Sequence, residues 1–172
     1  MGDFDSVPAN LPDDLASVPR RTFPAEKDQT DGELAIAAAL ERGATRLVLA
    51  GAFGGKRADH AFLHLALALR LAEAGTDVLL TSGAQEGIPL LRGTAGFDYA
   101  DGTLFSVLGF SELDGLTVTG AKWPLAHVKV AFGSSLTISN EVKSDKTGGR
   151  LEIALGHGRA MLLAHPYPLP ES

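Results

Sequence analysis

The sequence predicts an α/β half followed by an all-β half, and two observations carry this prediction. Up to about residue 95, short aliphatic runs alternate with stretches of helical periodicity, which is the pattern of strand–helix–strand units. Beyond that point the helical periodicity disappears, and short apolar runs are separated by Gly, Asp and Ser turns. We therefore expect an α/β domain at residues 1–95 and an antiparallel β-sandwich at residues 96–172.

The first half begins with a helix predicted from Asp28 to Arg42, because Asp28 or Thr30 can cap its start and Gly43 can end it. The elements expected next are a buried parallel strand at 46–50, a glycine-rich loop at 51–55, a helix from about 58 to 74 and a strand at 77–81. A strand, a glycine-rich loop and a helix in this order place ligands at the carboxyl ends of strands in α/β sheets.

The second half contains six short apolar runs. They lie at residues 104–108, 116–119, 127–132, 136–139, 151–155 and 160–163. Regular short strands with turn residues between them favour an antiparallel sandwich or barrel.

Composition excludes several classes of protein. The net charge of −6 over 172 residues offers no basic surface for nucleic acid, and the absence of cysteine excludes disulfides and thiolate chemistry. The longest apolar run, at 61–72, is interrupted by His64 and Arg70 and is too short to cross a bilayer. We expect a cytoplasmic protein without membrane or nucleic-acid partners.

Three acidic clusters carry the chemical signal. Asp3 and Asp5 lie in a GDFDS stretch, Asp28 and Asp31 in KDQTD, and Asp59 follows GGKRA. Mg²⁺ takes one or two carboxylates plus substrate phosphates as ligands, while Lys and Arg neutralise the remaining phosphate charge. The clusters therefore indicate a Mg²⁺–nucleotide site. The alternative is that these residues form turns and helix caps, which Asp and Ser also favour.

Five segments in order resemble the thiamine pyrophosphokinase family. They are residues 2–6, 27–35, 51–60, 123–125 and 138–141. The resemblance implies a Rossmann-like α/β nucleotide-binding domain followed by a β-sandwich. It also implies transfer of a pyrophosphoryl group from ATP to the hydroxyl of thiamine, which gives thiamine diphosphate and AMP. In the family a strand and a helix precede the first motif, whereas here Met1 stands directly before it.

The resemblance assigns the acidic residues to metal binding and catalysis. Asp3, Asp5, Asp28 and Asp31 are expected to hold Mg²⁺ and its water shell, and Asp28 or Asp31 can also accept the hydroxyl proton. Catalysis of such a transfer is mainly positioning and charge neutralisation, with Mg²⁺ and cationic side chains as clamps.

The same resemblance implies how the nucleotide is held. Arg57 is expected to bind phosphate, while Asp59 orients Arg57 or joins the metal shell. Lys56 is an extra residue beside it, so either cation can fill the phosphate role. The other expected nucleotide-binding residues are Ser6, Lys27, Thr30, Gly54 and Gly55.

Thiamine is a flat aromatic cation, so an aromatic ring is its natural partner. Trp123, the only tryptophan, is expected to stack on it; ordinary core packing is the alternative. Ser139 and Asn140 are expected to hydrogen-bond the aminopyrimidine. The resemblance implies a homodimer in which the sandwich of one subunit completes the thiamine site of its mate. Two other functions stay open: a pyrophosphokinase acting on a pterin alcohol, and a non-catalytic, truncated thiamine- or nucleotide-binding homologue.

Overall fold

The computed structural model describes residues 18–23, 28–53, 55–143 and 150–166. The chain divides into two compact units, residues 1–45 and residues 46–172. Five of the predicted site residues lie outside the described residues: Asp3, Asp5, Ser6, Lys27 and Gly54.

The first unit contains helix α2 (Asp31–Glu41), whose start is fixed by a capping box. The Thr30 hydroxyl accepts a hydrogen bond from the Glu33 N–H at 3.2 Å, and the Glu33 carboxylate accepts one from the Thr30 N–H at 3.0 Å. Gly43, with a φ of 85°, follows the end of the helix as predicted. Of the two predicted caps, Thr30 is therefore the one used, and Asp28 lies outside the helix.

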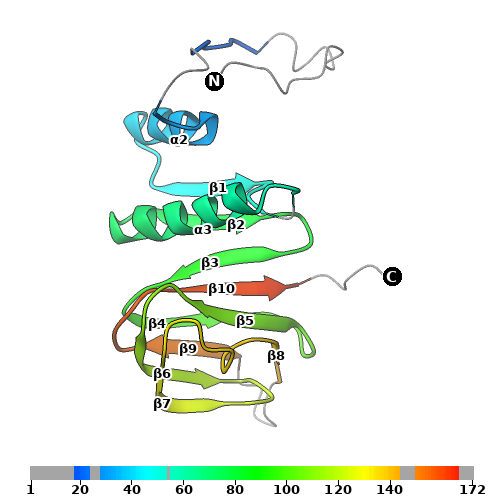
Figure 1. Ribbon diagram of the computed structural model, residues 1–172. Coiled ribbons are helices and arrows are strands. Elements are labelled where there is room, and N and C mark those ends of the chain that lie inside the picture. Colours follow the sequence, from blue (N-terminus) through cyan, green and yellow to red (C-terminus); the bar gives the residue numbers. More distant parts are fainter. Residues whose placement is uncertain (1–17, 24–27, 54, 144–149, 167–172) are drawn as a thin grey trace. The chain divides into compact units, whose positions relative to one another are not determined.

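The described residues of the second unit form one helix and ten strands (Figure 1). These are β1 (Arg46–Ala50), α3 (Ala58–Glu73), β2 (Asp77–Thr81), β3 (Glu86–Leu90), β4 (Gly93–Phe97), β5 (Leu104–Gly109), β6 (Leu113–Thr119), β7 (Leu125–Val130), β8 (Asn140–Glu141), β9 (Leu151–Leu155) and β10 (Ala160–His165). They form a mixed six-stranded sheet in the order β1-β2-β3-β10-β5-β8 and an antiparallel four-stranded sheet in the order β4-β9-β6-β7.

The main core of this unit is shared by the two sheets. Alternate residues of β10, including Leu162, join one apolar cluster with Phe105 of β5 and with Leu116 and Ile153 of the four-stranded sheet. Helix α3 packs against β2, β3 and β10. The chain therefore inserts its last described strand into the middle of the large sheet, where it pairs with β3 on one side and β5 on the other.

The predicted elements of the α/β half are confirmed at β1, α3 and β2, and β1 pairs with β2 in parallel. The sheet does not continue in parallel, because β3 runs antiparallel to β2. The Rossmann-like description and the boundary between residues 95 and 96 stay predictions. No helix among the described residues has the length and apolarity needed to cross a membrane.

The strand predicted at 136–139 is wrong, because this segment forms turns. Thr137 bonds to Val107 through both its backbone carbonyl and its hydroxyl, at 2.9 and 2.6 Å. Ser139 takes a φ of 60°, which a strand does not allow. Leu136 and Ile138 consequently remain exposed rather than joining the core.

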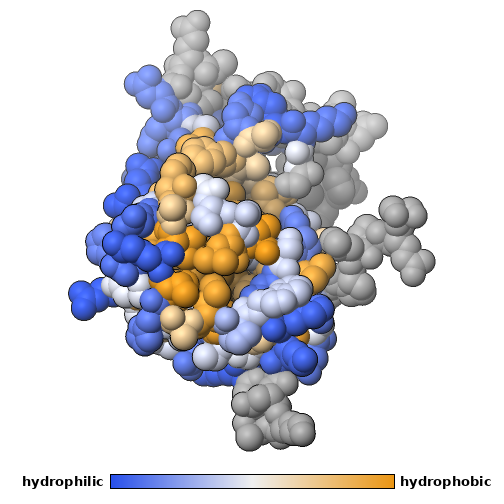
Figure 2. Space-filling view, turned by 60° about the horizontal axis from the view of Figure 1, so that its bottom comes forward, coloured by the Kyte–Doolittle hydropathy of each residue, from blue (hydrophilic) through white to orange (hydrophobic). Residues whose placement is uncertain are grey.

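Hydrophobic residues also reach the surface. Figure 2 shows them gathered in the middle of one face, with hydrophilic residues around them. The most exposed large hydrophobic residues among those described are Val18, Val48, Phe62, Leu104, Trp123, Phe132, Leu136 and Ile138. A single exposed hydrophobic residue is ordinary, so only a group of such residues carries an argument.

Candidate functional site

The glycine-rich loop after β1 is tied to both of its neighbours. The N–H groups of Gly51 and Ala52 donate to the Thr81 carbonyl at the end of β2, at 2.7 and 3.3 Å. The Nδ1 atom of His64, on α3, lies 2.7 Å from the Ala52 carbonyl oxygen, which makes it the protonated nitrogen of the ring. The loop is thus held against the end of the sheet and against the helix that follows it.

Arg57 and Asp59 form a two-point ion pair at the start of α3. Arg57 Nε donates to Asp59 Oδ1 at 2.9 Å, and Nη2 donates to Oδ2 at 2.6 Å. Both side chains are more than 60% exposed. The Arg57 guanidinium holds the pKa of the Asp59 carboxyl well below its usual range, and Asp59 raises the pKa of Arg57. The fork orients Arg57 and leaves its other N–H groups for a ligand.

Asp59 is not the N-cap of α3, so the alternative in which it serves as a helix cap is wrong. Arg57 occupies the N-cap position without a side-chain capping bond, and Asp59 lies in the first turn. Lys56, beside it, makes no ion pair among the described residues, whereas Arg57 is fixed. An oriented guanidinium next to a helix N-terminus is a favourable environment for phosphate.

Asp28 and Asp31 lie at the start of α2. Asp31 is the first residue of the helix, while Asp28 precedes the cap, so helical spacing does not place the two on one face. Thr30 uses its hydroxyl within the capping box. No group of three or more His, Asp or Glu side chains within the described parts of the chain is arranged to hold a metal ion.

Trp123 and Asn140 form the second candidate region. The nearly buried Asn140 accepts the Trp123 N–H at 3.2 Å and the Glu141 N–H at 2.8 Å through Oδ1, and its Nδ2 donates to the Trp123 carbonyl at 2.8 Å. Trp123 itself is 56% exposed, so core packing is not its role. Asn140 therefore holds the backbone that presents the indole, with only one amide hydrogen left to bind a ligand.

Two further residues in this region, Lys122 and Ser106, carry no sequence signal of their own. The Lys122 ammonium lies 4.9 Å from the centre of the Trp123 ring and pairs with the Glu141 carboxylate at 2.8 Å. Ser139 is exposed, and its backbone N–H donates to the Ser106 hydroxyl. Only the pairing of β8 with β5 brings Ser106 and Ser139 together.

Two family models match different parts of the chain. Residues 1–80 match the family model described as the thiamin pyrophosphokinase catalytic domain, and residues 97–154 match its vitamin B1 binding domain. The chain is 32% identical over 146 residues to thiamine pyrophosphokinase of Bacillus subtilis, which covers 83% of this chain and 68% of that protein.

Solved structures give the same result. The structure of thiamin pyrophosphokinase from Geobacillus thermodenitrificans superposes with a TM-score of 0.73 at 31% identity, covering 95% of this chain and 75% of the other. That of thiamine pyrophosphokinase from Bacillus subtilis gives 0.71 at 28% identity, covering 81% of this chain and 64% of the other. The chain belongs to the thiamine pyrophosphokinase family, the thiamine diphosphokinases that transfer a pyrophosphoryl group from ATP to thiamine.

Proposed function

We propose that this chain carries out the family's transfer, with the loop after β1 holding the nucleotide phosphates and the Trp123 region holding thiamine. One observation carries the proposal. The Arg57–Asp59 fork lies in the part that matches the catalytic domain, and the Trp123–Asn140 contact lies in the part that matches the vitamin B1 binding domain. The chemistry of each contact suits the ligand proposed for it.

In the loop after β1, Arg57 neutralises charge on the phosphoryl oxygens as the pyrophosphoryl group is transferred. Its orientation is fixed in advance by Asp59, so little side-chain freedom is lost when phosphate binds. Lys56, without such a partner among the described residues, supplies a mobile second charge. The description of this half as a Rossmann-like nucleotide-binding domain is part of the proposal.

The donor set fits Mg²⁺, which takes hard oxygen ligands. Asp28 and Asp31 would hold it together with Asp3 and Asp5, and the metal would supply neutralisation of the phosphate charge. Asp59 fits the role of orienting Arg57 better than that of a ligand, because both its oxygens accept from the guanidinium. Asp28 or Asp31 would take the proton from the attacking hydroxyl.

In the Trp123 region, the exposed indole of Trp123 offers a face for the cationic rings of thiamine. Asn140 keeps that indole in place, and the exposed Ser139 beside it can hydrogen-bond the aminopyrimidine. A pterin alcohol is a neutral acceptor and would gain less from this face. The arrangement therefore favours thiamine as the substrate.

We propose a homodimer because the two candidate regions lie at opposite edges of one sheet. The loop follows the edge strand β1, and Trp123 is bonded to Asn140 in the other edge strand, β8. Five strand spacings of about 4.8 Å separate these edges by about 24 Å. Reaction requires the hydroxyl and the phosphorus to approach to about 3–3.5 Å. Two copies can meet this requirement if the loop of one faces the Trp123 region of the other.

Exposed apolar side chains near β8 support this dimer. Trp123, Leu104 and Ile138 lie next to residues that are hydrogen-bonded across β5 and β8, and all three are at least 40% exposed. A group of this kind around a candidate site is what a subunit interface would cover. The interface would exclude water from the reacting groups.

The experiment is AMP release from ATP and Mg²⁺ with thiamine present or absent. We expect AMP only with thiamine, loss of activity when EDTA removes the metal, and weak or no activity with a pterin alcohol. Release that depends on the pterin alcohol instead would favour the alternative substrate. Binding of thiamine without any AMP release would favour the non-catalytic alternative.

The shared site is tested by mixing two inactive variants, Arg57→Gln and Trp123→Ala. A mixed dimer would contain one site with both residues intact, so random mixing should restore about a quarter of the wild-type activity. The matched control is a mixture of Arg57→Gln with a double variant that carries both changes, which should stay inactive. No recovery in the first mixture would contradict the shared site.

A further inference from the structure

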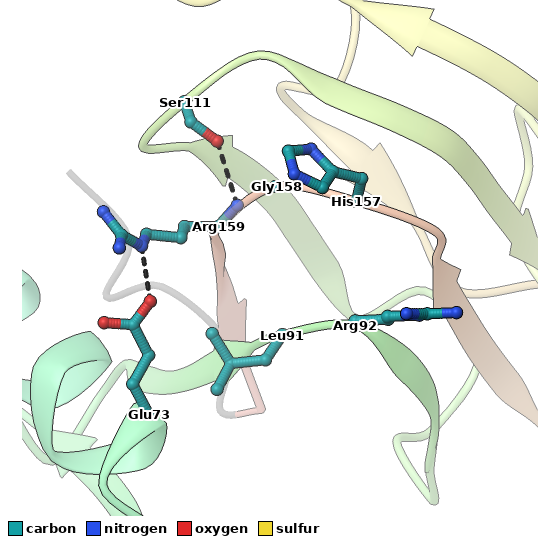
Figure 3. A pocket seen from close by; sticks show the side chains of 7 residues that line it. All are labelled: Glu73, Leu91, Arg92, Ser111, His157, Gly158 and Arg159. Atoms are coloured by element: carbon teal, nitrogen blue, oxygen red, sulfur yellow. Dashed lines mark hydrogen bonds and ion pairs between the residues drawn. The ribbon is translucent and has the colours of Figure 1, made fainter.

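A cavity of about 590 Å³ lies at the C-terminal end of α3, outside both candidate regions (Figure 3). Its volume falls within the range of small-molecule sites. Its wall is formed by Glu73, Leu91, Arg92, Ser111, His157, Gly158 and Arg159. About 21 Å of helix separates Glu73 from Asp59, at 1.5 Å per residue, so a ligand here would not touch the phosphate loop.

One wall of this cavity is formed by two turns, one between β5 and β6 and the other between β9 and β10. Hydrogen bonds between the two turns make this wall rigid. The Arg159 N–H donates to the Ser111 hydroxyl at 3.0 Å, and the Phe110 N–H donates to the Arg159 carbonyl at 2.8 Å. Asp114 and His157 exchange two backbone hydrogen bonds, at 2.9 and 3.0 Å. The wall is therefore built before any ligand arrives, which lowers the entropy cost of binding.

Gly158 shows how closely the two turns approach each other. It has a φ of 113°, and a Cβ at this position would lie only 2.4 Å from the Glu112 carbonyl oxygen. No other residue fits there without moving one of the turns. This close approach fixes the backbone between His157 and Arg159, the two side chains on either side of the glycine.

The cavity wall carries an excess of cationic groups. Arg159 Nε donates to the Glu73 carboxylate, as the dashed line in Figure 3 shows. The side chains of Arg92 and His157, in contrast, make no hydrogen bond or ion pair among the described residues. Leu91, between Glu73 and Arg92 in Figure 3, adds an apolar surface, and the Arg92 side chain extends away from the Glu73–Arg159 pair. One arginine and one histidine thus remain to bind an anion.

We propose that this cavity binds a small phosphate-bearing molecule at a site separate from the catalytic one. A guanidinium and an imidazole offer planar N–H donors that match phosphate oxygens, and the guanidinium remains charged at every physiological pH. Glu73 sets the affinity, because its carboxylate neutralises Arg159 and repels an anion. Removing that carboxylate should therefore strengthen binding, whereas removing Arg92 should weaken it.

The test is calorimetric titration with inorganic diphosphate in EDTA, carried out on an Arg57→Gln background so that the phosphate loop does not contribute. In this background we expect one binding event. Adding Arg92→Gln should weaken it by about tenfold or more, and adding Glu73→Gln should strengthen it severalfold. The matched control is Arg46→Gln, an exposed and ion-paired arginine on β1 that should leave the affinity unchanged.

Three results would overturn the proposal. The first is absence of diphosphate binding in the Arg57→Gln protein, and the second is an Arg92→Gln affinity equal to that of the background. The third is an equal loss with Arg46→Gln and Arg92→Gln, which would show attraction by overall charge rather than a site. Circular dichroism and urea unfolding of each variant would establish that the fold is retained.

Discussion

Replacing Asn140 with alanine should destabilise the fold and displace Trp123. The change removes three hydrogen bonds: two from the N–H groups of Trp123 and Glu141 to Oδ1, and one from Nδ2 to the Trp123 carbonyl. Asn140 is 8% exposed, so water replaces these bonds poorly. At about 1 kcal/mol of net stability for each bond, the free energy of unfolding should fall by about 3 kcal/mol.

Urea unfolding measures this change, and the fluorescence of the single tryptophan reports it directly. Asn140→Asp keeps both accepted bonds but places a carboxylate oxygen against the Trp123 carbonyl at a nearly buried position, so its cost should exceed the roughly 1 kcal/mol of the lost hydrogen bond. Ser135→Ala, an exposed change in the same loop, should stay within about 0.5 kcal/mol of the wild type. A loss below about 1 kcal/mol in Asn140→Ala would refute the view that this side chain holds the Trp123 backbone.

Three more outcomes are expected. Asp59→Asn, which releases Arg57 from its fixed orientation, should raise the KM for ATP more than the KM for thiamine. Because the Asp59 pKa is depressed, steady-state rates should show no Asp59 titration between about pH 5 and 8. Tyr99→Phe should lower the free energy of unfolding by about 1–2 kcal/mol, as urea unfolding at neutral pH would show. The Tyr99 pKa is raised by burial and by its carboxylate partner, so wild-type stability should fall as pH rises above about 10, and that fall should be smaller in the variant. His64→Leu should raise the KM for ATP by freeing the Ala52 carbonyl, whereas His64→Asn, which keeps a donor, should raise it less; equal KM values would refute a role in holding the loop.

The sequence is most informative where local signals coincide. The helix α3 follows a glycine-rich loop, has apolar residues at helical spacing and ends before Gly75, whose φ is 89°. Strands β1 and β2 are continuous aliphatic runs that hydrogen-bond to each other in parallel. Each of these elements is specified by its own residues, so its bounds could be predicted without knowledge of its neighbours.

Strands β3 and β4 were not predicted, because their residues are poor strand formers. Pro89 lies inside β3 and cannot donate a ladder hydrogen bond, and β4 contains Gly93 and Gly96. Gly87 is explained only by the folded structure: a Cβ there would lie 3.2 Å from the Phe53 ring and 3.3 Å from Leu163. Strand β3 pairs with β10 and β4 pairs with β9, both far along the chain. These pairings supply the stability that local propensity does not.

In the candidate site, too, contacts between neighbouring residues could be predicted from the sequence, whereas contacts between distant residues could not. The Arg57–Asp59 pair joins residues two positions apart, so the sequence could anticipate it. The Asn140–Trp123 contact joins residues 17 positions apart and gives Asn140 a structural role in addition to the ligand-binding role predicted for it. Only the tertiary structure could show this structural role, because it depends on which backbone groups lie beside the amide.

The position of β10 links the two candidate regions physically. This strand pairs with β3 on the side of the sheet where β1 and the loop after it lie. It pairs with β5 on the side where β8 and Asn140 lie. Its side chains are buried on both faces, since Met161 and Leu162 point to opposite sides and are both fully buried. The sheet therefore holds the two regions of one chain apart at a fixed separation. If the two regions hold the nucleotide and thiamine as proposed, this separation requires each region to complete the site of another copy, which is why recovery of activity by mixed variants is the decisive test of the proposed dimer.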